Sequence, residues 1–352
     1  MIDSRRDFLQ TVAAAMGTTP AMLGTFALGT LSPAMGESTR HGLTQRILSL
    51  FDGMPGQIAI KIFAPSTGGK PEFLLKSNSS KMLFVGSAIK TFILCEALRQ
   101  ADSPHVEKTI TEQQLALDAS VWTADSATFN PPHLSGMVSE RTALEAMIMH
   151  SDNTGTDMAL KLAGPDKVRS FIASAGLKNT LIPDSTRVFV GYLLGAKDYK
   201  TFTWDELQAA SNLNIVNPPL NLVETLASSA DDLVSYYARA LQGEFFKNKE
   251  TLAEFRRILS LADAISRALP IGVSAFAKGG SIDVPGFHCL CLAGGMFFDN
   301  RWVYYAATIN WNAAADTDPA TVGAFVGAVT QALALVKDAL SVFKHLNSTK
   351  PA

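Results

Sequence analysis

Short runs of alternating apolar and polar residues lie near both ends of the chain, and this period of two is typical of β-strands that bury one face. The first two runs flank a glycine-containing turn at residues 66–69 and predict a hairpin. The last two are joined by Asp299-Asn300, a pair suited to a tight turn. The five predicted strands cover residues 57–63, 72–76, 275–278, 288–298 and 302–310.

Helical periodicity, with apolar residues three or four positions apart, dominates the rest of the chain. The longest such pattern, residues 322–343, predicts a helix that covers the sheet. We therefore expect an α/β (α+β) fold with a sheet lobe from about 37–86 and 269–352 and a helical lobe from about 87–268, folded as one unit. Other helical patterns cover residues 39–51, 88–98, 139–149 and 204–210.

The composition is that of a globular protein with a sizeable core. Of 352 residues, 47% are hydrophobic and 18% are charged, and the formal net charge is −2. This balance gives no electrostatic reason to expect nucleic acid or an anionic membrane as a partner. Beyond residue 36 no run approaches about 18 uninterrupted apolar residues, so the mature protein should not span a membrane. We expect a monomer that acts on a small molecule.

Residues 1–36 have the features of an export signal rather than of a folded domain. The segment SRRDFLQ at residues 4–10 resembles the twin-arginine export consensus of bacteria. A moderately apolar stretch follows at 11–31, and Ala34-Met35-Gly36 offers the small residues that signal peptidase requires. We expect removal of this segment and a periplasmic or secreted domain, 37–352. The alternative is an ordinary N-terminal helix with two solvated arginines.

The chain contains three cysteines, an odd number. Cys289 and Cys291 alternate along one predicted strand and lie too close along it to bridge readily. Cys95 falls in an apolar helical run, where a buried thiol is expected, and a bridge from it to the strand is the weaker alternative. The spacing matches no zinc site, and we expect neither a metal nor another cofactor.

Two residues with catalytic potential, Ser87 and Lys90, stand at the start of the helical run at 88–98. Residues three apart share a helix face, so Lys90 would lie one turn from the Ser87 hydroxyl. A serine hydroxyl is a poor nucleophile until a base removes its proton, and a desolvated lysine can be that base. Unpaired N–H groups at the helix start would stabilise an oxyanion. The alternative is a surface serine beside a solvated lysine, because S-x-x-K is a short pattern.

Two further short motifs follow in the chain. Ser151-Asp152-Asn153 comes after the predicted helix at 139–149, and Lys278-Gly279-Gly280 ends an apolar strand. Taken singly, the first is an ordinary helix N-cap cluster and the second an ordinary glycine turn. The order S-x-x-K, S-D-N, K-[TSG]-G resembles the active-site serine enzymes that recognise penicillin, namely class A β-lactamases and penicillin-binding proteins. The resemblance covers most of the chain, about residues 40–340.

This resemblance implies a fold and an activity. The fold would be a five-stranded antiparallel sheet flanked by the terminal helices, with an all-helical lobe and the active site at their junction. The activity would be that of a serine hydrolase that opens a β-lactam amide. The alternative is a penicillin-binding protein-like D-alanyl-D-alanine peptidase or esterase with slow deacylation. A silent module that only binds a cell-wall peptide is disfavoured, because the serines and lysines of all three motifs are retained.

The resemblance also assigns roles to the motif residues. Ser87 would be acylated, Lys90 would accept or relay its proton, and Ser151 would pass a proton to the leaving nitrogen. Asp152 would hold its loop through backbone hydrogen bonds. The residues expected to bind substrate are Asn153 at the amide, Lys278 at the carboxylate, Gly280 by close backbone approach, and Ser281, whose N–H would form the oxyanion hole with that of Ser87.

Gly279 is the first departure from the family pattern, which usually has threonine or serine there to bind the substrate carboxylate. Ser281 is one candidate replacement. His288 is another, since it lies near where the family often has a carboxylate-binding arginine. The alternative for His288 is a buried histidine satisfied within the sheet. Gly279 therefore leaves the affinity for penicillins open.

The second departure is the lack of the glutamate that activates the deacylating water in the family. Its position maps to Thr186 or its neighbours, and the segment 188–222 is longer than in class A enzymes by roughly two dozen residues. Asp184 and Glu206 are the carboxylates near enough in sequence to substitute. We favour Glu206, because Trp204 could desolvate it and raise its pKa; the alternative is an exposed residue of a helix. Hydrolysis should be slower than in typical class A enzymes.

Overall fold

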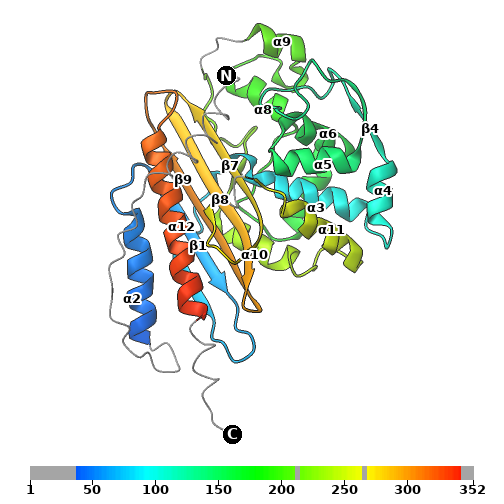
Figure 1. The fold of residues 1–352 in the computed structure, drawn as a ribbon. Coiled ribbons are helices and arrows are strands. Elements are labelled where there is room, and N and C mark those ends of the chain that lie inside the picture. Colours follow the sequence, from blue (N-terminus) through cyan, green and yellow to red (C-terminus); the bar gives the residue numbers. More distant parts are fainter. Residues whose placement is uncertain (1–36, 211–214, 264–267, 342–352) are drawn as a thin grey trace.

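A five-stranded antiparallel sheet forms the centre of the protein in a computed structural model, which describes residues 37–341 except 211–214 and 264–267 (Figure 1). The strand order is β2-β1-β9-β8-β7, so β7 is an edge strand. The predicted export segment lies outside the described residues. The strands are β1 (Gln57–Ala64), β2 (Phe73–Ser77), β7 (Ser274–Val284), β8 (Phe287–Phe298) and β9 (Arg301–Trp311).

The sequence pattern located all five of these strands, and the fold class is confirmed. Only β7 differs clearly in length, since residues 275–278 were expected and the strand continues to Val284. The reason is a hairpin with β8, in which Ser281 pairs with Leu290 and Val284 with Phe287. Strand pairing therefore extends β7 through the polar and glycine positions at which the apolar pattern ends.

Helices α2 (Glu37–Leu48) and α12 (Pro319–Ser341) cover one face of the sheet, and α10 (Ala230–Ala240) packs on the other (Figure 1). The 3-10 turn η1 (Ser49–Phe51) extends α2, and Phe51 meets Phe325 of α12 edge-on, with ring centroids 6.0 Å apart. Helix α12 is long and apolar enough to cross a membrane, but one side of it is buried in the core. The absence of a membrane span therefore stays a prediction.

The helical lobe lies beside the sheet and contains most of the remaining elements (Figure 1). Two small sheets join it, β3 (Leu83–Phe84) with β6 (Ala227–Ser228) and β4 (Gln114–Leu117) with β5 (Gly136–Ser139). The helices are α3 (Lys90–Gln100), α4 (Val106–Glu112), α5 (Glu140–Met149), α6 (Asn153–Ala163), α7 (Pro165–Ser174), α8 (Thr186–Leu193), α9 (Trp204–Ala209) and α11 (Lys249–Leu259), with 3-10 turns η2 (Gly86–Ile89) and η3 (Tyr199–Thr201).

Helix α3 runs through the middle of this lobe. Residues 90–98 are all buried, which is the expected state of a helix that is apolar on most sides. The expectation that Ser87 lies in the first α-helical turn needs a correction, because Ser87 lies in η2 and the α-helix begins at Lys90. The chain turns at Gly86, whose φ is +53°, so the serine enters a tighter 3-10 turn before the α-helix starts.

All three cysteines are buried and free, so the weaker alternative of a Cys95 disulfide is wrong. Burial raises the pKa of each thiol, which leaves them unreactive side chains of the core. Across the residues described, no group of three or more His, Cys, Asp or Glu side chains is placed to hold a metal ion.

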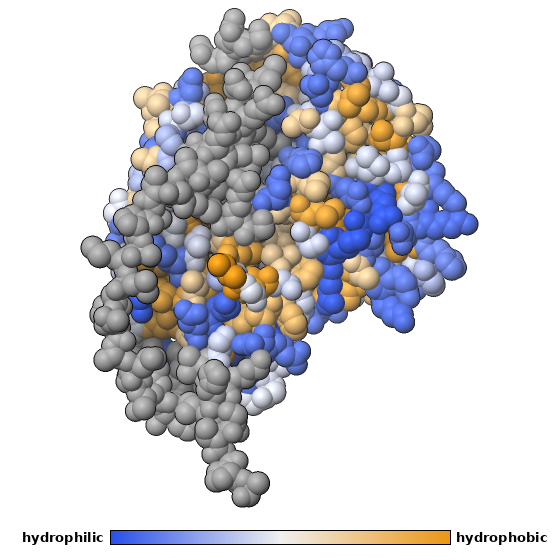
Figure 2. Space-filling model, in the orientation of Figure 1, coloured by the Kyte–Doolittle hydropathy of each residue, from blue (hydrophilic) through white to orange (hydrophobic). Residues whose placement is uncertain are grey.

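The surface of the helical lobe is largely hydrophilic on the face shown in Figure 2. Large exposed apolar side chains are scattered over several elements, and single residues of this kind are normal on a soluble surface. Within the described ranges, these exposed apolar side chains are Leu74, Leu134, Met137, Met149, Val216, Leu222, Val223 and Ile271. The expectation of a monomer stays a prediction.

Candidate active site

Ser87 lies where the sheet meets the helical lobe, and its side chain is 8% exposed. Strand β3 leads into its turn and is fixed to the sheet by Asn310 of β9. The Asn310 side chain accepts from Phe84 N (2.9 Å) and donates to Phe84 O (2.8 Å). The backbone before η2 is therefore fixed by a buried pair of hydrogen bonds, which sets the place of the serine.

Lys90 connects the first two motifs. Its side chain is 0% exposed, and Nζ donates to Asn153 Oδ1 (2.7 Å), to Ser151 O (2.7 Å) and to Ser151 Oγ (3.3 Å). A carbonyl or amide oxygen can only accept, whereas the Ser151 hydroxyl can accept from an ammonium or donate to a neutral amine. These contacts therefore suit both protonation states through which a catalytic lysine passes.

Asp152 shapes the loop that carries Ser151. Ser151 has a φ of +55°, which residues other than glycine rarely adopt. Asp152 is buried at the N-cap of α6, where Oδ1 accepts from Gly155 N (2.8 Å). Its Oδ2 accepts from Thr128 N (2.8 Å) and Phe129 N (3.1 Å). The carboxylate thus holds the serine in its unusual backbone conformation, which is the structural role that we expected.

The edge strand β7 lies directly against η2. A Cβ atom on Gly280 would lie 2.1 Å from Val85 O and 2.5 Å from Ser87 N. A Cβ atom on Gly86 would lie 2.9 Å from Ser281 N. Only glycine fits at either position without a backbone shift. The N–H groups of Ser87 and Ser281 therefore come from two closely apposed backbones, as an oxyanion hole requires.

Lys278 lies on the same face of β7 as Gly280, because side chains alternate along a strand. The Gly280 face is the one directed at η2. The Lys278 side chain is buried, and its Nζ donates to Gly279 O (2.9 Å). The structure thus brings a second buried lysine to the same junction as Ser87.

His288 lies on the opposite side of the sheet. It pairs with Asp283, an odd-numbered neighbour on β7 that faces away from η2. Its Nδ1 is 2.8 Å from Asp283 Oδ1, and its ring stacks on Trp311 with centroids 5.1 Å apart. The side chain is 0% exposed. His288 is therefore the buried histidine of our alternative, although its Nε2 has no hydrogen-bond partner among the described residues. Ser281 shares the face of Gly279, and its replacement of the hydroxyl absent there stays a prediction.

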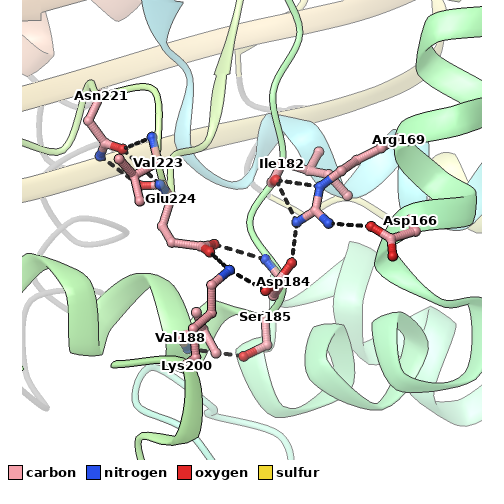
Figure 3. Close-up of polar contacts among 10 residues, drawn as sticks. All are labelled: Asp166, Arg169, Ile182, Asp184, Ser185, Val188, Lys200, Asn221, Val223 and Glu224. Carbon is pink, nitrogen blue, oxygen red and sulfur yellow. Dashed lines mark hydrogen bonds and ion pairs between the residues drawn. The ribbon is translucent and has the colours of Figure 1, made fainter. Parts of the chain in front are cut away.

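Asp184 is held in a network of ion pairs (Figure 3). Its carboxylate contacts Arg169 of α7 and Lys200 of η3, and Lys200 also contacts the buried Glu224. Burial alone would raise the pKa of Asp184, but hydrogen bonds and charge from Lys200 and Arg169 lower it overall. Asp184 thus helps to hold together the two ends of residues 185–223, which we call the long loop. Its lowered pKa makes its carboxylate a weak base near neutral pH.

The structure does not support our preference for Glu206 as the deacylation base. Glu206 is fully exposed and accepts from Thr203 N (2.6 Å) and Thr203 Oγ1 (2.7 Å), which forms a capping box at the start of α9. These hydrogen bonds lower its pKa. Trp204 packs instead in a cluster with Phe202 and Leu207, so it does not desolvate the carboxylate. The exposed helical residue of our alternative is the correct description.

Asp157 is a candidate that the sequence analysis missed. It lies one turn after Asn153 on α6 and is 5% exposed. Its Oδ1 accepts from Thr186 N (2.6 Å) and Thr186 Oγ1 (2.7 Å), and its Oδ2 accepts from Arg187 N (3.2 Å). Burial raises the pKa of Asp157 to about 6, although these hydrogen bonds and the Arg187 charge oppose the rise. The sequence does contain a signal for Asp157: it lies four residues after Asn153, and residues four apart share a helix face.

The match to known families covers most of this arrangement. Residues 42–331 match the family described as the β-lactamase enzyme family. The chain belongs to this β-lactamase family. Its activity class is therefore that of a β-lactamase-type hydrolase, and a role for a serine at the junction of the lobes is an inference from the family. No curated protein sequence matches the chain.

Several solved structures share the β-lactamase fold. TLA-3 extended-spectrum β-lactamase is 17% identical, with a TM-score of 0.65, over 86% of this chain and 99% of that one. A class A β-lactamase from Bacteroides cellulosilyticus is 16% identical (TM-score 0.64, 85% and 98%). A point mutant of PBP-A, described as an acyl-enzyme complex with penicillin G, is 17% identical (TM-score 0.61, 85% and 97%). At such identities the likeness concerns the fold.

Proposed function

We propose that this protein is an exported serine hydrolase that is acylated at Ser87 and opens the amide of a β-lactam ring. The observation that carries the proposal is the set of contacts from Lys90 Nζ to Ser151 and Asn153, one turn from Ser87. They join a buried base to a second hydroxyl, and the backbone N–H of Lys90 donates to Ser87 O, which keeps the nucleophile one turn away. Family membership supports the same reaction class.

Acylation would begin when Ser87 Oγ attacks the carbonyl carbon of the ring amide and its proton passes to Lys90 Nζ. The C–N bond then breaks, and the nitrogen takes a proton from Ser151 Oγ. Lys90 returns a proton to Ser151 across their 3.3 Å contact, so protons balance. The N–H groups of Ser87 and Ser281 would hold the transient oxyanion, and such donors are typically worth about 3–4 kcal/mol each.

Substrate binding would use groups that surround the nucleophile. Asn153 Nδ2 donates one of its two N–H groups to Ala124 O (3.0 Å), so the second is available for a substrate amide oxygen. Lys278 would supply positive charge for a substrate carboxylate, and Gly280 would let the substrate approach the β7 backbone. Gly279 offers no hydroxyl to that carboxylate, which is expected to weaken penicillin binding.

A penicillin-binding protein-like peptidase or esterase is the second candidate. One observation favours it: Asp184 and Glu206, the two carboxylates that the sequence offered as substitutes for the deacylating glutamate, are engaged in other contacts. An acyl-enzyme that lacks a well-placed base accumulates, and an acyl-enzyme complex is the described state of the PBP-A mutant. In this function, turnover would be slow and the adduct would persist.

Intact-mass spectrometry with benzylpenicillin, followed by a chase, tests both functions. We expect one adduct on the wild type, none on Ser87→Ala, and a normal adduct on Ser260→Ala, a control at an exposed hydroxyl. Loss of the adduct during the chase would favour the β-lactamase, and persistence would favour the peptidase or esterase. An adduct retained by Ser87→Ala, or no adduct with either penicillin or an activated ester, would overturn the proposal.

Export is proposed from the segment at residues 1–36, and Arg5 and Arg6 are its central pair. Replacing both with lysine keeps the charge but changes the geometry that a twin-arginine receptor reads. We therefore expect precursor to accumulate in the cytoplasm of a bacterial host, measured by fractionation and immunoblotting. Replacing the exposed Lys197 with arginine is the control. Normal processing of the double variant would argue against twin-arginine export.

A further inference from the structure

Thr186 stands between the motif residues and a buried carboxylate. It begins α8, its side chain is 3% exposed, and its Oγ1 lies 2.7 Å from Asp157 Oδ1 and 3.5 Å from Asn153 O. A hydroxyl has one proton, and the short contact to a charged oxygen takes it in preference to the long contact to a carbonyl. The lone pairs of Thr186 Oγ1 then stay available to accept a proton from water.

A short series of contacts leads from the nucleophile to this pair. Lys90 lies one turn from Ser87 and donates to Asn153 Oδ1 (2.7 Å). Asn153 O faces Thr186 Oγ1, and Asp157 lies one turn further along α6 than Asn153. The two acids that the sequence suggested, Asp184 and Glu206, have their oxygens committed to cations or to a helix cap, as described above. Asp157 is thus the acid best placed to act near the acyl group.

We propose that Asp157, acting through the Thr186 hydroxyl, provides the base that hydrolyses the acyl-enzyme at Ser87. This inference rests on the proposed function, because it presupposes an acyl group on that serine. Thr186 is the group that touches the attacking water, and Asp157 is a positioning residue that also receives the proton. The pair takes the place of the glutamate that the sequence lacks.

The hydrolysis step balances with these groups alone. The water oxygen bonds to the acyl carbon, one water proton passes to Thr186 Oγ1, and the original Thr186 proton passes to Asp157 Oδ1. Asp157 then passes this proton to Lys90 through solvent. The bond from the acyl carbon to Ser87 Oγ breaks, and that oxygen leaves with the electron pair and takes a proton from the Lys90 ammonium so formed. Asp157 is again ionised and Lys90 is again the neutral amine that acylation requires.

The reaction requires ionised Asp157, and this gives it a pH dependence. Burial raises the pKa of Asp157 to about 6, so the deacylation rate should fall as the pH drops through that value. Because its pKa is raised, the folded protein prefers the neutral, protonated form of the Asp157 carboxyl. Ionisation of this group at pH 7 therefore lowers the free energy of unfolding, which is unusual for an acid with a purely structural role. Arg187 of α8 is the charged group that acts on the Asp157 carboxylate. Other charged groups at α6 are Lys90 of α3 at Asn153, Asp152 at the helix N-cap and Lys161 at Ser120. The Arg141–Glu145 pair of α5 is directed at α4 and α11, and Arg169 of α7 contacts Asp166 and Asp184.

The experiment uses benzylpenicillin or an activated ester on the full chain and separates adduct formation from adduct loss. Thr186→Val removes the hydroxyl at nearly constant shape, and we expect deacylation to slow by about 10²-fold or more while acylation is kept. Thr186→Ser keeps a hydroxyl and should restore the rate. Asp157→Asn should abolish the fall of the deacylation rate near pH 6 and lower its plateau.

Thr180 provides a matched control. It is also buried, and its Oγ1 donates to the buried Asp232 (2.9 Å) in a pair of the same kind. Thr180→Val should therefore cost similar stability but leave deacylation unchanged. Equal slowing in Thr180→Val and Thr186→Val would mean a general loss of structure and would overturn the proposal. If Asp157→Asn does not fold, the contrast between Thr186→Val and Thr186→Ser decides.

The outcomes also separate this inference from the proposed function. Wild-type deacylation that is independent of pH around 6, or unchanged in Thr186→Val, would overturn the role of the pair while Ser87 remains the acylated residue. A wild type that forms no adduct at Ser87 would overturn both.

Discussion

The motif cluster (Ser87, Lys90, Ser151, Asn153 and Lys278) and the long loop meet at Asn153, yet different kinds of contact hold them. In the motif cluster, tight turns and helix caps orient the side chains within each motif, and contacts from Asn310 and Lys90 bring the motifs together. In the long loop, Lys200 contacts Asp184 and Glu224 across 16 and 24 residues. Acylation should therefore depend on the first region, and deacylation should be adjustable through the second.

Of the changes considered, replacing Lys90 with methionine should have the largest effect, and it should slow acylation. Methionine has similar length but no titratable group, so Ser87 loses its base while the burial is kept. We expect adduct formation to slow by about 10²–10⁴-fold, measured by mass spectrometry against time. Lys161→Met is the control, because Lys161 donates to Ser120 near the surface. Adduct formation at the wild-type rate in Lys90→Met would remove Lys90 from the mechanism.

Gly280→Ala should come next. The added Cβ would lie 2.1 Å from Val85 O, so the β7 backbone must move away from η2 and displace the Ser281 N–H. Loss of one oxyanion donor typically costs about 10²–10³-fold, and we expect a fall of that size in acylation. In Gly327→Ala no atom lies within 4 Å of the added Cβ, so that variant should keep full activity. Normal acylation of Gly280→Ala would show that the close approach is not needed.

The sequence predicted the local arrangement within each motif because that information is local, while the roles of these residues stay predictions. The spacing from Ser87 to Lys90 sets one turn, and Asp152 is followed by the N–H group that it caps. The alternation of residues in the strands likewise predicted the sheet. The sequence placed Ser87 in an α-helix, whereas it lies in a 3-10 turn. This turn depends on a strand that is distant in sequence, because the backbone of Ser281 lies against Gly86.

The long loop was predicted poorly because its contacts are distant in sequence. Asp157 and Thr186 are 29 residues apart, and nothing in either neighbourhood indicates that a hydroxyl would meet that carboxylate. Glu206 looked promising beside Trp204, but the capping box directs the two side chains apart. A local pattern cannot show which of several acids is buried, because burial is decided by the packing of the whole chain.

Lys200→Met should affect the long loop and leave the motif cluster unchanged. It removes the cation that joins Asp184 to the buried Glu224, whose side chain is 1% exposed. Since Lys200 itself is half exposed, we expect a loss of only about 1 kcal/mol in the free energy of unfolding, with faster hydrogen exchange in α8. Lys197→Met, at an exposed lysine of the same loop, is the control. A slowed acylation in Lys200→Met would contradict the separation of the two regions.

Glu206→Gln should have the smallest effect, and it sharpens the comparison within the long loop. Glutamine keeps an oxygen that can accept from Thr203, so the start of α9 is largely preserved. The change removes the charge of a fully exposed carboxylate that is already engaged by its cap, and we expect burst and steady-state rates equal to those of the wild type. Asp157→Asn, assayed beside it, removes a buried charge and should slow only the steady-state phase.

If the effects were reversed, so that Glu206→Gln slowed turnover and Asp157→Asn did not, deacylation would depend on α9 rather than on the contact between α6 and α8. The long loop would then contribute its own base, and the sequence-based preference for Glu206 would be restored.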